Sequence, residues 1–244
     1  MDDELYPEDE LRRQALIRLL SIGAFSLSPL SVAEAAWWGR KPKKMPSDKS
    51  IFTLEGDVTV NRQQATVDTR IRPGDTVETG PNSKAIFVVG TDSFLMRSNS
   101  EMQIEGSNFL LNSLRLVTGR VLSVFGRRSF KQKLQMNTPT ATIGIRGTGV
   151  YLEADPDLTY LCTCYGSTEL RAAQNPDDVA FINTTHHDDP KYISNTPSKG
   201  TQIRSAPFIN HTDPELKMLE ALVGREVPFG LEDDLYRNPR RDDY

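Results

Sequence analysis

The sequence has few of the side chains that most often carry chemistry, with only two cysteines and three histidines among 244 residues. So few cysteines exclude a disulfide-rich scaffold. No excess of positive charge is present either, since 29 lysines and arginines face 33 aspartates and glutamates, and we therefore expect no nucleic-acid binding. The main apolar run, residues 19–32, has 14 residues, fewer than the roughly 20 of a membrane-spanning helix. Peripheral or no membrane contact is expected.

The first 35 residues have the organisation of an export signal. Arg12, Arg13 and Arg18 precede the apolar run, and residues 33–35 form an Ala-x-Ala cleavage sequence. The Arg12–Arg13 pair also resembles the start of a twin-arginine signal. We expect a periplasmic protein, in an oxidising compartment. An uncleaved N-terminal anchor or an interfacial helix is the alternative interpretation.

The centre of the chain is predicted to consist of short strands. Short apolar runs favour strands at residues 58–60, 85–89, 114–116 and 121–125. Turn-forming residues lie between them at 73–75, 80–82 and 90–92. Turns spaced by about ten residues indicate a sandwich, barrel or short solenoid, so the fold class is predicted to be mainly β.

Several motifs in the same region carry a family resemblance. They are Gly56-Asp57-Val58, residues 71–80 (IRPGDTVETG), residues 84–88 (KAIFV), residues 116–121 (LVTGRV) and residues 137–148 (NTPTATIGIRGT). Their order resembles that of the FecR domain family over residues 51–170, half of the chain. The strings at residues 162–166 (CTCYG), 186–188 (HHD) and 211–213 (HTD) further resemble the tail of some exported FecR-domain proteins.

The resemblance implies an exported β-solenoid-like or sandwich module that serves in envelope sensing and regulation. FecR proteins themselves pass a signal to a sigma factor through a cytoplasmic domain. Only 18 residues precede the apolar run here, fewer than a folded domain needs, so we expect a stand-alone module. The expected organisation is an export signal at 1–35, a basic linker at 36–50, a FecR-like domain at 51–170, a Cys/His-linked appendix with a short helix at 171–230, and a tail at 231–244.

Arg146, Gly147 and Thr148 are predicted to form a structural turn. Gly147 permits a positive φ, and the Arg146 guanidinium can bind carbonyls or an acidic partner across the turn. The segment is not a phosphate-binding loop, because no Lys-Ser/Thr ends it and no helix is predicted after it.

Cys162 and Cys164 lie two positions apart in a predicted strand that ends in a turn at Gly166. Alternate strand residues share a face, so both sulfurs are expected to point the same way, with Cα atoms about 6.6 Å apart. A disulfide across that distance is strained and easily reduced. A metal ion can join the two thiolates with less strain. Metal binding, a disulfide and inert packing all remain open at this point.

The three histidines follow within 50 residues of Cys162, which makes a mixed sulfur and imidazole site plausible chemistry for Zn or Cu. His186 and His187 are predicted to lie in a loop that ends before Pro190. His211 precedes a predicted helix start, in which either Thr212 caps in a box with Glu215 or Asp213 caps with proline in the first turn. The helix is expected to bury Leu216, Leu219, Leu222 and Val223 and to end at Gly224.

The leading hypothesis is a non-enzymatic periplasmic binding or sensory module with a protein partner in the cell envelope. The alternative is a metal-binding or thiol-redox protein whose site residues are Cys162, Cys164, His186, His187 and His211. Catalysis is not expected, because no carboxylate pair forms an acid/base motif and no family signature surrounds either cysteine.

Overall fold

The computed structural model describes residues 42–107, 110–128 and 134–230, and this part of the chain is mainly β with one short helix. The predicted export signal at 1–35, part of the predicted linker and the predicted tail at 231–244 lie outside the described residues. The elements are β1 Ile51–Glu55, β2 Val58–Val60, β3 Gln63–Gln64, β4 Thr76–Thr79, β5 Lys84–Val89, β6 Asp92–Met96, β7 Ser100–Ser107, β8 Leu110–Val124, β9 Leu134–Asn137, β10 Ala141–Ala154, β11 Leu158–Ala172, β12 Val179–Thr184, β13 Lys191–Ser198, β14 Thr201–Ser205 and α3 Asp213–Leu222. The predicted fold class is confirmed.

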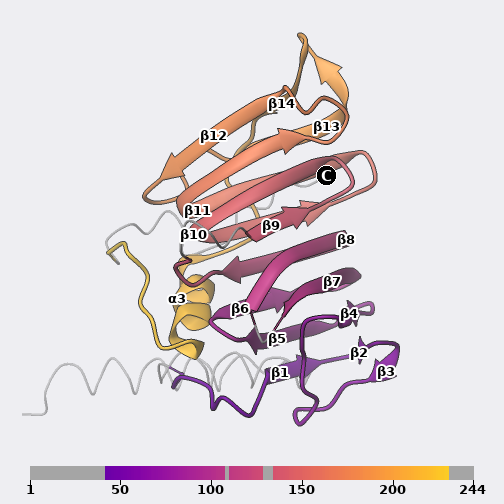
Figure 1. Cartoon of the computed structure of the whole chain (residues 1–244), viewed down its shortest axis with the longest axis vertical. Helices are drawn as coiled ribbons and strands as arrows, with labels where there is room; N and C mark the ends of the chain where they lie inside the picture. Colours follow the sequence, from indigo (N-terminus) through magenta and orange to yellow (C-terminus); the bar gives the residue numbers. More distant parts are fainter. Residues whose placement is uncertain (1–41, 108–109, 129–133, 231–244) are drawn as a thin grey trace, which may run out of the picture. The chain divides into compact units, whose positions relative to one another are not determined.

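The strands form one large sheet that does not close into a barrel. Its main path runs β14-β13-β11-β10-β9-β8-β7-β4-β2-β3, and β1, β5, β6 and β12 join at its sides. Neighbouring strands are antiparallel except β8 and β9. Figure 1 shows the strands stacked from β1–β3 to β12–β14, with α3 beside β6. The described helix is too short and too polar to cross a membrane.

Alternation of side chains along the strands gives the central sheet two buried faces. One face holds the main apolar core, which contains Phe94, Val121, Leu152 and Leu161. The residues that alternate with these along each strand point to the other face. Strand pairing across β6, β8, β10 and β11 places four of them side by side: Leu95, Leu122, Tyr151 and Cys162. This second face is where the functional candidates lie.

Helix α3 covers the second face. Leu216, Leu219 and Leu222 share one side of the helix and are fully buried, as their spacing predicts. The Ser93 hydroxyl on β6 donates a 2.6 Å hydrogen bond to the Leu219 carbonyl, which ties the helix to the sheet. Thr212 is the N-cap in a capping box with Glu215, so the first of the two predicted caps is confirmed.

Two sequence-based predictions of local structure are wrong. Arg146, Gly147 and Thr148 lie inside the long strand β10, where the pairing with β11 shifts register, and not in a turn between strands. Gly147 does take a positive φ of 61°, and Arg146 lies 3.7 Å from Glu169 on the neighbouring strand. Gly166 does not end its strand either, because β11 continues to Ala172. In both cases the glycine lies at an irregularity in the pairing of two strands. Such irregularities favour glycine as turns do, so the sequence pattern resembles that of a turn.

The separate apolar runs at 114–116 and 121–125 belong largely to one strand, β8. Predicted turns occur at Pro73–Gly74, Pro81–Asn82 and Gly90–Thr91. Strands continue beyond residue 170 as β12, β13 and β14, all in the same sheet as β11. The proposed domain boundaries stay a prediction.

Candidate metal centre

The site begins with an interruption in the pairing along one edge of β11. Strand β13 pairs with Leu158–Leu161 of this edge, and β12 pairs with Gly166–Arg171. Residues 162–165 of β11 lie between these two pairings. The chain of β12 and β13 therefore runs along β11 as one interrupted strand, and residues 185–190 leave the ladder opposite the two cysteines.

Both cysteine side chains are fully buried on the second face of the sheet and are free thiols. Cys162 pairs with Tyr151 of β10, whereas the register shifts between the pairs Val150–Thr163 and Gly149–Tyr165. Cys164 is the extra residue of this bulge, a feature that redirects a side chain within a strand. Its thiol lies 3.8 Å from the Cys162 carbonyl oxygen and donates to it.

The loop of residues 185–190 places His187 over the two cysteines. His187 has a left-handed φ of 57°, and its backbone N–H donates to the Cys164 carbonyl at 2.9 Å. The Asp188 carboxylate fixes the loop by accepting from the Thr184 hydroxyl at 2.6 Å and from the Thr185 N–H at 3.1 Å. These hydrogen bonds, the Thr184 bond first, lower the pKa of Asp188 and keep it ionised.

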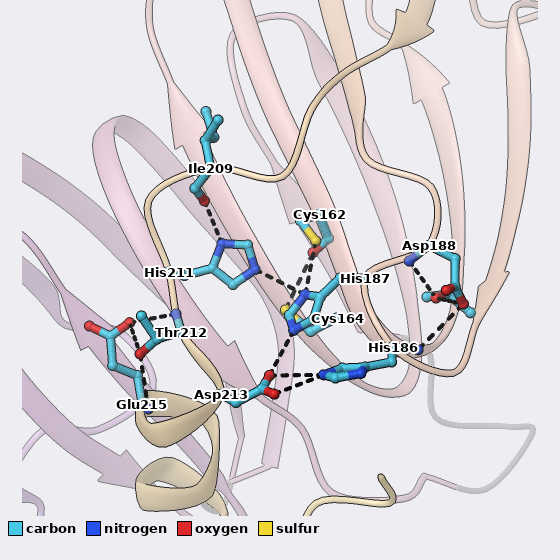
Figure 2. A network of polar contacts seen from close by, with 11 residues as sticks. Cys162, Cys164, His186, His187, Asp188, Ile209, His211, Thr212, Asp213 and Glu215 are labelled. Carbon is cyan, nitrogen blue, oxygen red and sulfur yellow. Dashed lines mark hydrogen bonds and ion pairs between the residues drawn. The ribbon is translucent and has the colours of Figure 1, made fainter. Parts of the chain in front are cut away.

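His211 comes from the segment between β14 and α3, which is fastened to the second face. The Tyr160 hydroxyl donates to the Pro207 carbonyl at 2.9 Å and accepts from the Ile209 N–H at 3.3 Å. The His211 ring stacks on Tyr151 with a centroid distance of 4.5 Å. Its side chain therefore occupies one position, next to His187 (Figure 2).

Four potential ligand atoms converge at this point. The sulfurs of Cys162 and Cys164 and one nitrogen each of His187 and His211 lie within 4.8 Å of one another, and all four residues are buried. Nδ1 of His187 is 3.2 Å from Nε2 of His211 and 3.4 Å from the Cys162 sulfur. A tetrahedral zinc site has edges of about 3.3 Å between nitrogens and about 3.5 Å between sulfur and nitrogen. The two contacts of His187 Nδ1 have these dimensions.

When the two rings are neutral, their hydrogen bonds favour the tautomers whose lone pairs lie on the converging nitrogens. The Nδ1–H of His211 donates to the Ile209 carbonyl at 2.7 Å, so Nε2 of the neutral ring has no hydrogen. The Nε2–H of His187 donates to Asp213 at 3.1 Å, which leaves its Nδ1 toward the thiols. A carbonyl or carboxylate behind a ligating histidine is the usual outer support of protein metal sites.

Asp213 also binds His186. Nε2 of His186 lies 2.9 Å from Oδ2 and 3.0 Å from Oδ1 of Asp213, and its ring stacks on Phe229 at 4.1 Å. Burial alone would raise the pKa of Asp213, but hydrogen bonds from His187 and His186 outweigh it, and the pKa lies below its ordinary value. Asp213 is therefore a carboxylate between two imidazoles.

The same contacts shift the pKa values of the two thiols in opposite directions. Burial would raise the pKa of Cys162, but the hydrogen bond from Cys164 and the nearby His211 lower it well below its ordinary value. Burial and the neighbouring Cys162 sulfur raise the pKa of Cys164. Burial would lower the pKa of His187, but hydrogen bonds to Asp213 and Cys162 raise it to about 8. Without a metal ion, His187 is therefore mainly protonated and Cys164 mainly a thiol at neutral pH, whereas Cys162 ionises more readily than an ordinary thiol.

Four of the five residues predicted as ligands thus come together: Cys162, Cys164, His187 and His211. The fifth, His186, lies on the other side of Asp213, with His187 and Asp213 as its neighbours. Sequence analysis considered Asp213 only as a possible cap and missed its contacts to both histidines. The capping box predicted from the sequence fixes the start of the helix, and it places Asp213 directly after the N-cap Thr212 and two residues from His211. That position was the available signal.

Known proteins do not identify the family of this chain. No family model and no curated protein matches the chain, so the resemblance to the FecR family stays a prediction. Two crystal structures of a protein from Parabacteroides distasonis, described as a candidate anti-sigma factor, are similar. The first has a TM-score of 0.44 and 12% identity and covers 60% of this chain and 74% of its own. The second has the same TM-score and identity, with 58% and 70% covered. A likeness at this level assigns no function to the chain.

Proposed function

We propose that this protein is a metal-binding β module in which Cys162, Cys164, His187 and His211 hold one Zn(II) ion. The observation that carries the proposal is the set of four buried ligand atoms within 4.8 Å of one another. Once His187 loses its proton, both imidazoles direct their lone pairs to the common centre, because the other nitrogen of each ring donates to a carbonyl or a carboxylate. Little rearrangement is needed for binding.

The ligand set favours zinc. Two sulfurs and two imidazole nitrogens in a tetrahedral arrangement are a typical zinc set, and Cu(I) is the competing soft ion. Two thiolates also balance the charge of a divalent cation, which matters in a buried position where an unpaired charge is costly. Four protein ligands leave no position for a substrate, so the proposed site is structural or regulatory.

The proposed ion would join three segments that are distant in sequence. Cys162 and Cys164 lie on β11, His187 lies in the loop between β12 and β13, and His211 lies directly before α3. Binding energy at such a site stabilises the folded arrangement of the segments it joins. The ion would thereby fasten the 206–222 segment, which includes α3, to the second face of the sheet.

An enzymatic role is not part of the proposal. Cys162, His187 and Asp213 do have the connectivity of a nucleophile, a base and an orienting acid, with distances of 3.4 Å and 3.1 Å. The Cys162 side chain is 0% exposed, however, so a substrate carbonyl cannot reach the sulfur. Burial of the whole group supports ligation rather than nucleophilic attack.

In the cell, we place the module in the periplasm as a FecR-like, non-enzymatic binding or sensory protein with a protein partner in the envelope. The order of the sequence motifs over residues 51–170 and the features of residues 1–35 support this placement. Fractionation of cells that express the full chain tests it. Recovery of the protein in the cytoplasm, with Met1 still present, would contradict the export.

Elemental analysis of the full chain, purified under reducing conditions without added metal, tests the metal site. About one equivalent of zinc is expected in the wild type, and less than about a tenth in Cys162→Ser/Cys164→Ser. Thr163→Ser is the matched control, because it alters the buried residue between the cysteines and keeps the hydroxyl that contacts Thr168. Wild-type protein with no bound metal, or with a Cys162–Cys164 disulfide in its place, would overturn the proposal.

A further inference from the structure

The proposed zinc centre has no direct opening to solvent. Cys162, Cys164 and His211 are 0% exposed and His187 is 2% exposed. An ion must therefore pass through a shell of side chains to reach the four ligand atoms or to leave them. The sides of this shell differ in their chemistry, and the difference indicates where the ion passes.

On the His211 side, the shell is aromatic. The His211 ring stacks on Tyr151 and lies 4.4 Å from the Phe208 ring, between centroids, and its outer nitrogen is bonded to the Ile209 carbonyl. None of these rings offers a good ligand to a divalent cation. Passage on this side would leave the ion without ligands in an apolar environment, where a charge is costly.

On the His187 side, potential ligands continue outward. Nε2 of His187, the Asp213 carboxylate and Nε2 of His186 form a second group whose ligand atoms lie within 4.8 Å of one another. The contacts of Asp213 to the two imidazoles measure 2.9–3.1 Å, close to the edges of about 3.3 Å expected between nitrogen and oxygen ligands of one ion. Figure 2 shows His186 next to the Asp213 carboxylate, on the side away from the cysteines. The His186 side chain is 13% exposed, so this group reaches the surface.

We infer that His186, Asp213 and Nε2 of His187 form a second cation position, through which a divalent transition-metal ion enters and leaves the buried centre. The inference rests on the proposed function. His187 is shared between the two positions, with one ring nitrogen facing each. Imidazole and carboxylate ligands suit Zn(II), Co(II) and related ions.

A neutral imidazole has one nitrogen lone pair, so His187 serves one position at a time. In the outer position it ligates through Nε2 and carries its hydrogen on Nδ1. In the buried position it ligates through Nδ1, and the hydrogen is on Nε2, bonded to Asp213. Inward transfer of the ion leaves both sulfurs as thiolates, and any proton still on Cys162 or Cys164 is released to water. His187 loses its Nδ1 hydrogen to water and takes up one on Nε2, so its own proton count does not change. No electron transfer is involved.

The test uses metal-free full-length protein in reducing buffer and Co(II) as the probe. The thiolate-to-cobalt absorption reports occupation of the buried centre only, because the outer position has no sulfur. His186→Gln is the test variant, since its amide can still donate to Asp213 but is a poor ligand. Thr185→Ala, the preceding residue in the same loop, is the control.

We expect His186→Gln to slow both the loading of Co(II) and its release to a chelator by about tenfold. Because both rates fall together, the Kd and the final absorbance should equal those of the wild type, which also shows that the buried centre is intact. Thr185→Ala should load at the wild-type rate. A Kd raised in proportion to the slower loading would indicate a structural role for His186 and overturn the inference.

Failure of the two proposals can be distinguished. If the wild type shows no thiolate-to-cobalt absorption, the proposed metal site is wrong and the entry position falls with it. If the wild type binds Co(II) and His186→Gln loads at the same rate, the entry position alone is overturned and the buried centre stands.

Discussion

Nδ1 of His187 and Nε2 of His211 face each other at 3.2 Å inside the protein, and the opposite nitrogen of each ring is engaged by an acceptor. Two lone pairs directed at each other in a buried position are unfavourable unless a proton or a cation lies between them. The raised pKa of His187, about 8, shows the same preference for positive charge at this point. A cation at this point would satisfy both lone pairs, and four predictions follow from the contacts of the proposed centre.

Removal of the metal is expected to destabilise the fold. Binding to the native state alone contributes about 2.7 kcal/mol at a free metal concentration 100 times the Kd. For a chain of this size, a chelator should lower the Tm by about 5–10 °C, as measured by calorimetry. The Cys162→Ser/Cys164→Ser variant serves as the control, and its Tm should not respond to the chelator. An equal response of both proteins would show that the chelator acts elsewhere.

Asp213→Asn is expected to weaken metal binding without removing a ligand of the buried centre. The carboxylate orients the His187 ring and raises its basicity, and loss of such an outer group reduces affinity by about 10–100-fold. Competition with a chromophoric chelator measures the change. Asp178→Asn is the matched control, since that carboxylate binds Thr201 and Gln202 at the edge of the sheet. The same loss of affinity in both variants would argue against a specific role of Asp213.

Metal affinity is expected to fall as the pH falls. His187, whose pKa is raised to about 8, keeps its proton below that pH, and the raised pKa of Cys164 keeps this thiol protonated as well. The lowered pKa of Cys162 makes this sulfur the easier of the two to deprotonate. Binding near pH 7 should therefore release about one proton more than binding above pH 8, where His187 is already neutral.

Calorimetry in buffers of different ionisation enthalpy counts the released protons directly. The slope of the logarithm of the affinity against pH should be steeper by about one near pH 7 than above pH 8, because His187 loses its proton between them. His187→Gln should bind more weakly and should lose the change of slope near pH 8. A single slope across this range in the wild type would contradict the assignment of the additional proton to His187.

Gly149→Ala is expected to destabilise the bulge that carries Cys164. A Cβ at this position would lie 2.5 Å from the Tyr165 ring, whose hydroxyl contacts Glu220 on α3. Overpacking of this kind costs about 1–3 kcal/mol, which urea denaturation would detect. Gly230→Ala, with no atom within 4 Å of the added carbon, is the control and should leave the free energy of unfolding unchanged. A neutral effect of Gly149→Ala would show that the ring moves without cost.

The sequence by itself determined the features that depend on neighbouring residues. Alternation of apolar residues predicts the strands and their buried faces, and the two-residue spacing of Cys162 and Cys164 places both sulfurs on one face. The Thr212–Glu215 pair and the apolar spacing of the following residues predict the start and the buried face of α3. These relationships extend over a few residues, so the local pattern contains them.

Only the tertiary structure decided which histidines join the cysteines. His186 and His187 are adjacent and chemically equivalent in the sequence, but the interruption opposite residues 162–165 of β11 directs His187 to the thiols and His186 to the far side of Asp213. The location of Arg146, Gly147 and Thr148 inside β10 likewise depends on pairing with β11. Register between strands is set by contacts across the sheet, and no local pattern of residues specifies it.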